Sequence, residues 1–353
     1  MHTNSANPYI SIVIICEAWN HFLEESLPYY SKLDYPNFEV LVFTTDKVAL
    51  SREAVQKNYH NIKFIAEPST KNKPAEKRDL ALKYAKGEIF AFIDDDAFPH
   101  KDWLKNAVKY FDDENVAAVG GPGVTPENAN IFEKASGWTT ASPLGGFGNS
   151  YRFIPEQKRE VDDYPSMNLI VRADDFKKIK GFDSNYYPGE DTKLCLDLTK
   201  KLGKKIIYDP KILVYHHKRP LFEKHLLQNG RFGLHRGHFA KILPETSRRW
   251  FYFIPSVFAV GNILGLLVLI LNETFALNIL GILAYIYKNA LFLYLVLLFV
   301  NAVWVLIKSH NFFAAILTIP GVFLTHFWYG LKFLQGFLLV KKEKVNDTYG
   351  RPE

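Results

Sequence analysis

Cysteine is scarce in this sequence, and its scarcity excludes two kinds of architecture. Only two cysteines, Cys16 and Cys195, occur among the 353 residues, and they lie far apart. A disulfide framework and a cysteine-based zinc site both need more of them at closer spacing. We also expect no signal peptide, because residues 1–8 are polar and the apolar run at 10–16 is too short to form one.

A glycine-rich phosphate loop is absent from the first turn. The apolar stretch at 10–15 predicts a buried strand, and CEAWN follows it at 16–20. A dinucleotide-dependent dehydrogenase would carry G-x-G-x-x-G at this turn, and a P-loop is excluded there as well. If the protein binds phosphates, a metal ion and basic side chains have to neutralise them.

Charge is nearly absent from the last third of the chain. Between residues 251 and 307 only Glu273 and Lys288 are charged, whereas residues 1–249 have a mixed, soluble composition. Apolar runs of this length are typical of membrane helices. They predict spans at 251–271 and at 312–340. The run at 275–307 is either one long tilted helix or two helices broken near Lys288. We favour three spans plus an interfacial piece over four spans.

A basic segment at 216–249 precedes the apolar region. It contains eight lysines or arginines and five histidines, but only two glutamates. Such clusters attract anionic lipid, at about 1 kcal/mol per basic residue near the surface. They also suit a diphosphate or a lipid phosphate, and the plain alternative is a solvated helix face. Arg248 and Arg249 predict a multi-pass protein of the cell membrane with its soluble domain in the cytoplasm.

These shifts in composition divide the chain into four parts. We expect a soluble domain at 1–215, a juxtamembrane segment at 216–249, transmembrane helices at 250–340 and a polar tail at 341–353. The net charge of +6 is modest, and we expect no nucleic-acid partner.

Strands and helices alternate along the soluble part. This alternation predicts a parallel sheet with helices on both faces. The expected strands are 10–15, 39–43, 62–65, 89–93, 116–119, 168–171, 206–208 and 212–215, and the expected helices are 22–32, 75–86, 103–111, 173–180 and 189–202. Residues 124–165 are predicted to be irregular. The glycine-rich stretch at 142–148 within them is either an acceptor-side loop or a surface loop without a role.

Three carboxylates, Asp94, Asp95 and Asp96, directly follow the apolar run at 89–93. Ligands bind at the carboxyl ends of strands in open α/β sheets. Because side chains alternate along an extended segment, Asp94 and Asp96 should point the same way. We expect these two to hold Mg²⁺ or Mn²⁺ against substrate phosphates. The alternative is a solvated acidic turn or an N-cap for the helix that begins near Trp103.

A second acidic pair, Glu190 and Asp191, opens a predicted helix about a hundred residues later, and His216 comes next. A metal held against a diphosphate makes that diphosphate a leaving group. A separate carboxylate can then accept the proton of an attacking hydroxyl. The combination indicates group transfer from a diphosphate-linked donor, of which a nucleotide-sugar is the obvious example.

Five motifs, in this order and spacing, resemble those of the family 2 glycosyltransferases of GT-A fold. They are KRDLA at 77–81, FIDDD at 92–96, GFD at 181–183 with GEDTKL at 189–194, Pro210 followed by His216, and QNGRF at 228–232. The resemblance covers about residues 9–232. It implies an α/β domain with a Rossmann-like, mostly parallel sheet, followed by an α-helical transmembrane region.

The resemblance also implies roles for individual residues. FIDDD looks like the D-x-D motif, so the metal falls to Asp94, Asp96 and His216. Asp191 becomes the catalytic base, with Glu190 beside it. The implied donor-binding residues are Glu17, Asp46, Lys77, Arg78, Asp94, Asp95, Gln228 and Arg231. For Arg78, a surface salt bridge with Asp79 or Glu76 is an equally good account.

Two departures from the family pattern concern the donor and processivity. TTDK stands at 44–47 where the family usually has DDGS, and we expect Asp46 to substitute in contacting the nucleoside. Phe232 replaces the tryptophan of Q-x-x-R-W, which weakens any inference of processive synthesis.

The activity implied is inverting, metal-dependent sugar transfer at the cytoplasmic membrane face. Residues 120–122, 142–152, 165–168 and 326–330 look most like membrane-bound exopolysaccharide-type enzymes, which extend lipid-linked saccharides. The acceptor expected is therefore a hydroxyl of a membrane-associated saccharide. One alternative is a polyprenyl-phosphate sugar synthase. The other is a catalytically silent, membrane-anchored subunit that binds a nucleotide-sugar.

Overall fold

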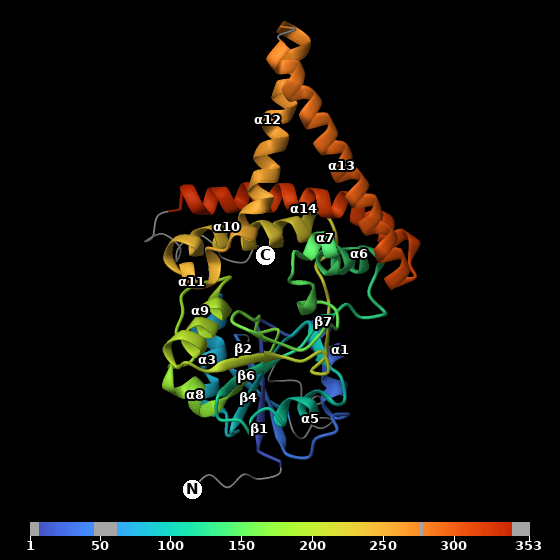
Figure 1. Cartoon of the computed structure of the whole chain (residues 1–353). Coiled ribbons are helices and arrows are strands. Elements are labelled where there is room, and N and C mark those ends of the chain that lie inside the picture. The colour runs from blue at the N-terminus through green and yellow to red at the C-terminus, as the bar shows by residue number, and fades with distance from the viewer. Residues whose placement is uncertain (1–6, 46–61, 276–277, 341–353) are drawn as a thin grey trace. The chain divides into compact units, whose positions relative to one another are not determined.

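The computed structural model describes residues 7–45, 62–275 and 278–340, so the predicted donor residue Asp46 lies outside the described ranges. The chain forms two compact units (Figure 1). The first lies within residues 1–126 and 151–217, and the second within 127–150 and 218–342.

An eight-stranded sheet forms the centre of the first unit. Its strands are β1 (Ile10–Cys16), β2 (Phe38–Thr44), β3 (Ile62–Ala66), β4 (Ile89–Asp94), β6 (Val116–Gly120), β8 (Arg159–Val161), β9 (Asn168–Arg172) and β10 (Lys205–Tyr208). Their order is β3-β2-β1-β4-β9-β6-β10-β8. β1, β2, β3 and β4 run parallel, but β9 runs antiparallel to both of its neighbours, β4 and β6. The predicted parallel arrangement is thus correct on the β3-β2-β1-β4 side, and the sheet becomes mixed at β9.

A second, three-stranded sheet has the order β5-β11-β7. Its strands are β5 (Ala97–Pro99), β7 (Gly123–Val124) and β11 (Val214–His216). The strand predicted at 212–215 is therefore β11, which pairs antiparallel with β5 rather than joining the large sheet. This pairing places His216 opposite Ala97, one residue after Asp96.

Helices cover both faces of the large sheet. They are α1 (His21–Tyr30), α3 (Pro74–Asp79), α4 (Ala81–Tyr84), α5 (Trp103–Val108), α8 (Ala173–Lys178) and α9 (Glu190–Leu196), the last continued by a π-helical turn at Asp197–Lys201. Successive side chains of β1 alternate between two hydrophobic clusters, one packed with α1 and α5 and the other with α8 and α9. Burial on both faces explains why the strands read as unbroken apolar runs.

The helix predicted at 75–86 is two short helices instead, α3 and α4, and it ends at Tyr84. The backbone N–H groups of Lys86 and Gly87 donate to the side chain of Ser11, at 3.2 and 2.8 Å, rather than to helical carbonyls. The buried carboxylate of Glu39 also accepts from Lys86 N–H. Polar side chains of the neighbouring strands thus stop the helix before Gly87.

The second unit is helical among its described residues. Its helices are α6 (Ile131–Ala141), α7 (Pro143–Gly146), α10 (Glu223–Ile242), α11 (Pro244–Ser247), α12 (Ile254–Phe275), α13 (Asn278–Ser309) and α14 (Phe312–Leu338). Three helical segments of the described chain, Trp250–Phe275, Asn278–Ser309 and Phe312–Leu338, are long and apolar enough to cross a membrane. The second is one continuous helix, so the predicted alternative of a break near Lys288 is wrong.

Residues 124–165 are not irregular as predicted, because they contain α6, α7 and the edge strand β8. The side chain of Asn130 caps α6 by accepting from the N–H groups of Phe132 and Glu133. α6 packs against α14, and its buried residues, including Ala135 and Ser136, are small. The helix is therefore defined by packing against a segment almost 180 residues later in the chain, which local sequence does not reveal.

Candidate active site

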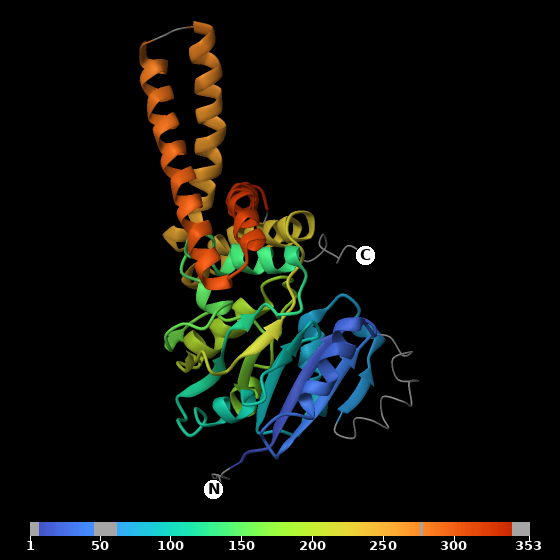
Figure 2. The ribbon, with the colours of Figure 1, turned by 90° about the vertical axis from the view of Figure 1, so that its right-hand side faces the viewer.

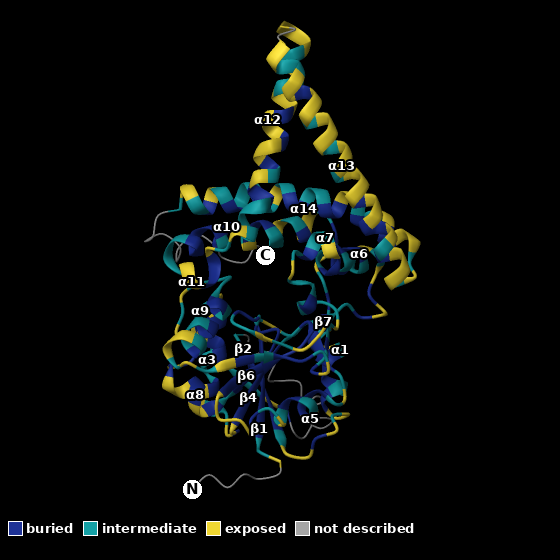
Figure 3. Cartoon of the chain, in the orientation of Figure 1, coloured by how far each residue is buried: buried dark blue, intermediate teal, exposed yellow. Residues whose placement is uncertain are grey.

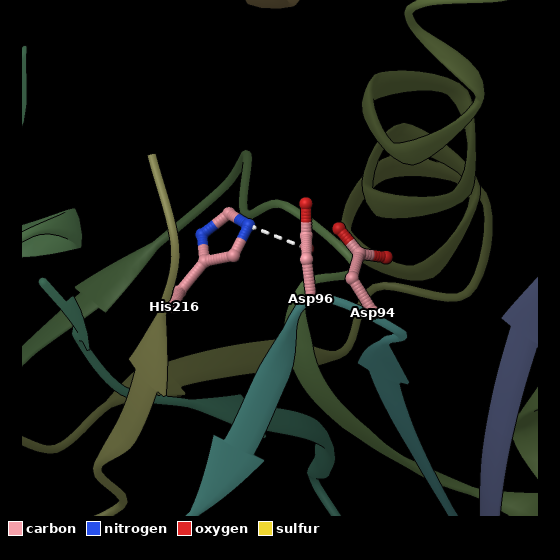
Figure 4. Close-up of side chains that lie close together, drawn as sticks. All are labelled: Asp94, Asp96 and His216. Carbon is pink, nitrogen blue, oxygen red and sulfur yellow. Dashed lines mark ion pairs between the residues drawn. The ribbon is translucent and has the colours of Figure 1, made fainter. Parts of the chain in front are cut away.

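Asp94, Asp96 and His216 lie together beyond the carboxyl end of β4 (Figure 4). One ligand atom of each lies within 4.8 Å of the others, and His216 Nε2 is 3.0 Å from Asp96 Oδ1. Two carboxylates and an imidazole form a donor set that suits Mn²⁺, and the carboxylates suit Mg²⁺. The structure therefore assembles the three residues that were predicted to bind metal.

Pairing between strands brings this cluster together. Asp94 ends β4, and Asp96 directly precedes β5. Because β11 pairs with β5, His216 comes alongside Asp96, and the N–H of His217 donates to the Asp96 carbonyl at 3.0 Å. A residue 120 positions later in the sequence thus reaches the acidic turn.

Asp95 takes a different direction from its neighbours. Its Oδ2 accepts a hydrogen bond of 2.7 Å from Asn20, whose own Oδ1 caps α1. Asp95 is not part of the metal-type cluster, by which we mean Asp94, Asp96 and His216, found among the described residues. This agrees with the alternation expected for an extended segment, while its predicted contact with the donor stays a prediction.

Arg78 lies inside the site rather than on the surface. Its Nη2 is 2.9 Å from Asp94 Oδ1, and its Nη1 is 3.0 Å from Glu190 Oε1. The residue is only 6% exposed, so the expected alternative of a surface salt bridge is wrong. Burial alone would lower the pKa of Arg78, but the two carboxylates raise it above its ordinary value. The guanidinium therefore stays charged and joins the acidic turn to α9.

Glu190 and Asp191 stand at the start of α9 but have different partners. Glu190 is bound by Arg78 and accepts from the N–H of Gly189 at 3.0 Å. The buried Oδ1 of Asp191 has no hydrogen-bond partner among the described residues. A buried acceptor without a partner is uncommon and calls for a functional explanation. Of the two carboxylates, Asp191 is the one left with an oxygen that could take a proton.

Burial is the main cause that raises the pKa of both carboxyl groups. For Glu190 the neighbouring Asp191 adds to the effect and Arg78 opposes it. For Asp191 the main opposing influences are Arg78 and hydrogen bonding with Ser166. The two groups titrate as a pair, and both bind a proton at higher pH than an ordinary carboxyl.

The predicted role of Asp191 as catalytic base, combined with its raised pKa, leads to an expected pH profile. A general base must be ionised, so activity should be present above its pKa and lost as the pH falls through it. We expect the acid limb of kcat/KM to lie above about 3.9, the ordinary value for aspartate. The measurement is kcat/KM against pH at saturating metal, with circular dichroism to verify that the protein stays folded. A limb at or below the ordinary value would contradict the buried-base assignment.

Lys77 and Glu17, two predicted donor residues, belong to one network around the buried side chain of Lys77. Lys77 Nζ donates to Glu17 Oε1 at 2.8 Å, to the Cys16 carbonyl at 2.9 Å and to Thr45 Oγ1 at 2.8 Å. Thr45 in turn donates to Glu17 Oε2 at 2.7 Å. Gln228 and Arg231 lie on α10, in the second unit. The roles of these four residues in donor binding stay predictions.

Asp79 is a residue of the site region that sequence reasoning missed. Its carboxylate accepts from the N–H groups of Phe182 and Asp183, at 2.7 and 3.1 Å. Burial raises the pKa of Asp79 to about 6, against the effect of these two donors. Gly181 precedes them with a φ of +82°, and a Cβ there would overlap Asp79. The two hydrogen bonds to Asp79 thus hold the GFD turn at residues 181–183 against α3. In the sequence, the position of Asp79 next to Arg78 could have indicated this role.

Comparisons with known proteins find glycosyltransferases. The family model described as glycosyl transferase family 2 matches residues 11–179. A protein of Methanococcus voltae, dolichyl N-acetyl-alpha-D-glucosaminyl phosphate 3-beta-D-2,3-diacetamido-2,3-dideoxy-beta-D-glucuronosyltransferase, is 25% identical over 97% of this chain and 99% of its own length. The glucosyl-dolichyl phosphate glucuronosyltransferase of Haloferax volcanii is 26% identical over 39% of this chain and 46% of its own.

Solved structures support the fold. A mannosyltransferase of Pyrobaculum calidifontis in complex with GDP-Man and Mn²⁺ matches with a TM-score of 0.50 at 21% identity. The match covers 67% of this chain and 65% of that one. The predicted GT-A fold is confirmed.

Proposed function

We propose that the chain is a glycosyltransferase of family 2, supported by the match of that family model to residues 11–179, and that it transfers a sugar from a nucleotide-sugar to a hydroxyl of a lipid-linked saccharide. The transfer is metal-dependent and inverts the anomeric centre. The observation that carries the proposal is the bridge made by Arg78, whose guanidinium binds both Asp94 of the metal-type cluster and Glu190 beside the base.

The residues at the two ends of this bridge have different chemical roles. Asp94, Asp96 and His216 would hold Mn²⁺ or Mg²⁺, which when bound stabilises the departing nucleoside diphosphate as a Lewis acid. Asp191 accepts the proton of the acceptor hydroxyl through Oδ1, which has no other partner among the described residues. Arg78 holds the two carboxylate-bearing segments at a fixed spacing, which favours a single in-line displacement.

Relatives and charge together support a lipid-linked acceptor at a membrane surface. The names of the Methanococcus voltae and Haloferax volcanii relatives both include a dolichyl phosphate carrying a sugar. The basic segment 216–249 separates the catalytic domain from the candidate spans, and we infer that it faces anionic lipid on the cytoplasmic side. A polyprenyl-phosphate sugar synthase would differ in using a lipid phosphate oxygen as the acceptor.

A donor screen tests this function. Purified, detergent-solubilised protein is incubated with a panel of nucleotide-sugars and membrane lipid extract, and release of nucleoside diphosphate is measured with Mn²⁺, Mg²⁺ or EDTA. We expect one or a few donors to react, only with metal and faster with lipid. Release that persists unchanged in EDTA would contradict metal dependence, and no release or binding of any donor would contradict transfer.

The acidic turn provides a matched pair of variants for the metal site. Asp96→Asn removes a charged ligand, so we expect metal-stimulated release to fall on the order of a hundredfold or more, because charge stabilisation by the metal contributes several kcal/mol. Asp95→Asn changes the adjacent carboxylate, which binds Asn20 instead, and should keep the metal dependence. Steady-state rates against Mn²⁺ concentration provide the comparison. Equal loss of Mn²⁺ dependence in both variants would contradict the assignment of Asp96.

A further inference from the structure

Helix α14 packs against a helix that cannot lie in hydrocarbon. α10 contains eight charged or histidine side chains among its residues, and α14 contacts it along much of its length. Figures 1 and 2 show α14 side by side with α10, crossing the base of the α12–α13 hairpin instead of running along it. A polar helix of this kind is costly to place in a membrane core, and so is a helix that lies against it.

Glycines bring the two backbones into close contact over about two helical turns. A Cβ on Gly237 of α10 would overlap the carbonyl of Phe333, and one on Gly233 would lie 2.7 Å from the carbonyl of Tyr329. From the other side, a Cβ on Gly336 of α14 would overlap the carbonyl of Leu234. These contacts fix the register of α14 on α10, because no side chain separates the helices there.

Polar contacts hold α14 at positions beyond the glycines. The buried ring of His225 on α10 is 2.7 Å from Ser136 Oγ on α6 and 2.8 Å from Thr325 Oγ1 on α14. Burial lowers the pKa of His225 to about 4, so the ring is neutral. At the far end, Lys241 Nζ donates to the Val340 carbonyl at 2.6 Å. α6, α10 and α14 therefore form one layer within the second unit.

The α12–α13 hairpin has the opposite character. The buried residues of α12 all lie between Pro255 and Gly265, near its start, and four of the five buried residues of α13 lie between Leu298 and Val305, near its end. Much of the rest is exposed (Figure 3), and the exposed residues include large apolar ones such as Ile270 at 63% and Phe292 at 67%. The hairpin joins the layer at its base and presents hydrocarbon-like surface elsewhere.

We propose that only α12 and α13 cross the bilayer, and that α14 lies in the membrane interface with α6 and α10, so that the C-terminal tail remains on the side of the catalytic domain. The proposal rests on the membrane location inferred above. Its partner is a lipid bilayer. The apolar surface offered to it includes the hairpin and exposed side chains at the two ends of α14, namely Phe312, Phe313, Ile316, Leu338 and Leu339.

Helix lengths agree with this arrangement. The 22 residues of α12 span about 33 Å, close to the roughly 30 Å of a hydrocarbon core. The 32 residues of α13 span about 48 Å, which is too long for one upright crossing. Its excess lies at its end, where Asn301 Oδ1 accepts from Leu144 N–H of α7 at 3.1 Å and Trp304 contacts Trp138 of α6. The end of α13 thus belongs to the layer rather than to the span.

The charge of the tail provides an independent reason. Lysines occupy positions 341, 342 and 344, directly after α14. With three spans these lysines would face the side opposite Arg248 and Arg249. With two spans all of them share one side, as the positive-inside rule favours.

Cysteine labelling tests the topology without relying on activity. Both native cysteines are buried, so the unaltered protein provides the background. Single variants Glu273→Cys near the hairpin tip, Lys308→Cys at the end of α13, and Asn346→Cys and Gly350→Cys in the tail are placed in right-side-out and inverted sealed vesicles. Each is treated with a membrane-impermeant maleimide, and labelling is expressed as a fraction of that in denaturing detergent. Asp112→Cys, an exposed position of the first unit, marks the catalytic side.

We expect Lys308→Cys and both tail variants to label from the same side as Asp112→Cys, and Glu273→Cys from the other side. Tail labelling from the side of Glu273→Cys would overturn the proposal in favour of three spans. Labelling of all positions from one side would overturn it as well, and would contradict the membrane-spanning location. In either case the donor screen decides independently whether sugar transfer survives.

Discussion

Replacing Asp191 by asparagine is expected to lower kcat by about 10²- to 10⁴-fold, the usual contribution of a positioned general base. Asparagine preserves the shape of the side chain but cannot accept the hydroxyl proton. Binding of the donor with its metal should change little, because Asp94, Asp96 and His216 are untouched. Single-turnover rates and calorimetric donor binding measure the two effects separately.

Asp197→Asn is the matched control for this variant. It makes the same change at the start of the π-helical turn that follows α9, where Asp197 binds Lys193 at 2.8 Å and is not part of the metal-type cluster. We expect a rate close to that of the unaltered protein. The base assignment would be wrong if Asp191→Asn kept its rate, or if it lost donor binding as completely as turnover.

Replacing Arg78 by methionine should destabilise the catalytic domain by about 3–5 kcal/mol, the usual cost of removing one partner from a buried ion pair. Methionine fills similar space, but it leaves Asp94 and Glu190 close together without the guanidinium that binds both. The repulsion between the two carboxylates, and their burial without a positive partner, raise the free energy of the folded state but not that of the unfolded state. Denaturant unfolding of the solubilised protein, followed by tryptophan fluorescence in EDTA, measures the loss.

Two further variants test whether the loss of stability is caused by breaking the ion pairs of Arg78. Lys83→Met removes a basic side chain that is exposed on the next helix, and we expect it to change stability by less than about 0.5 kcal/mol. Adding Glu190→Gln to Arg78→Met should recover part of the loss, because it removes one of the uncompensated carboxylates. Equal stability of the Arg78 and Lys83 variants would contradict a buried bridge.

The acidic turn could be predicted because its signal is local. An apolar run followed by carboxylates indicates a buried strand that ends at a ligand site, and side-chain alternation separates Asp95 from Asp94 and Asp96. His216 required more, because it reaches Asp96 only through the pairing of β11 with β5. The resemblance to a family provided that link, whereas residue spacing alone did not.

Features defined by distant packing could not be predicted in the same way. Arg78 reads as a surface residue of a charged helix, and its partners Asp94 and Glu190 lie 16 and 112 positions away. The antiparallel direction of β9 leaves no trace in an apolar strand that is buried on both faces. α6 is short, polar in part, and stabilised by contacts with α10 and α14. In each case the deciding neighbour lies far along the chain.

In the apolar C-terminal region, amino-acid composition likewise does not predict how the helices pack. Hydropathy finds three helices long enough to cross a membrane, but it does not register what each helix packs against. α14 differs from α12 and α13 because α10 lies along it. In the arrangement that we propose, membrane topology depends on tertiary contacts as much as on helix length.

Transfer of label from donor to lipid tests the central claim most directly. The purified protein is incubated with a reactive nucleotide-sugar labelled in its sugar, together with Mn²⁺ and membrane lipid extract, and label in the organic phase is compared with nucleoside diphosphate released. We predict equal amounts of the two products, and loss of both in EDTA and in Asp191→Asn. Release of nucleoside diphosphate with all label left in the aqueous phase would contradict a lipid-linked acceptor.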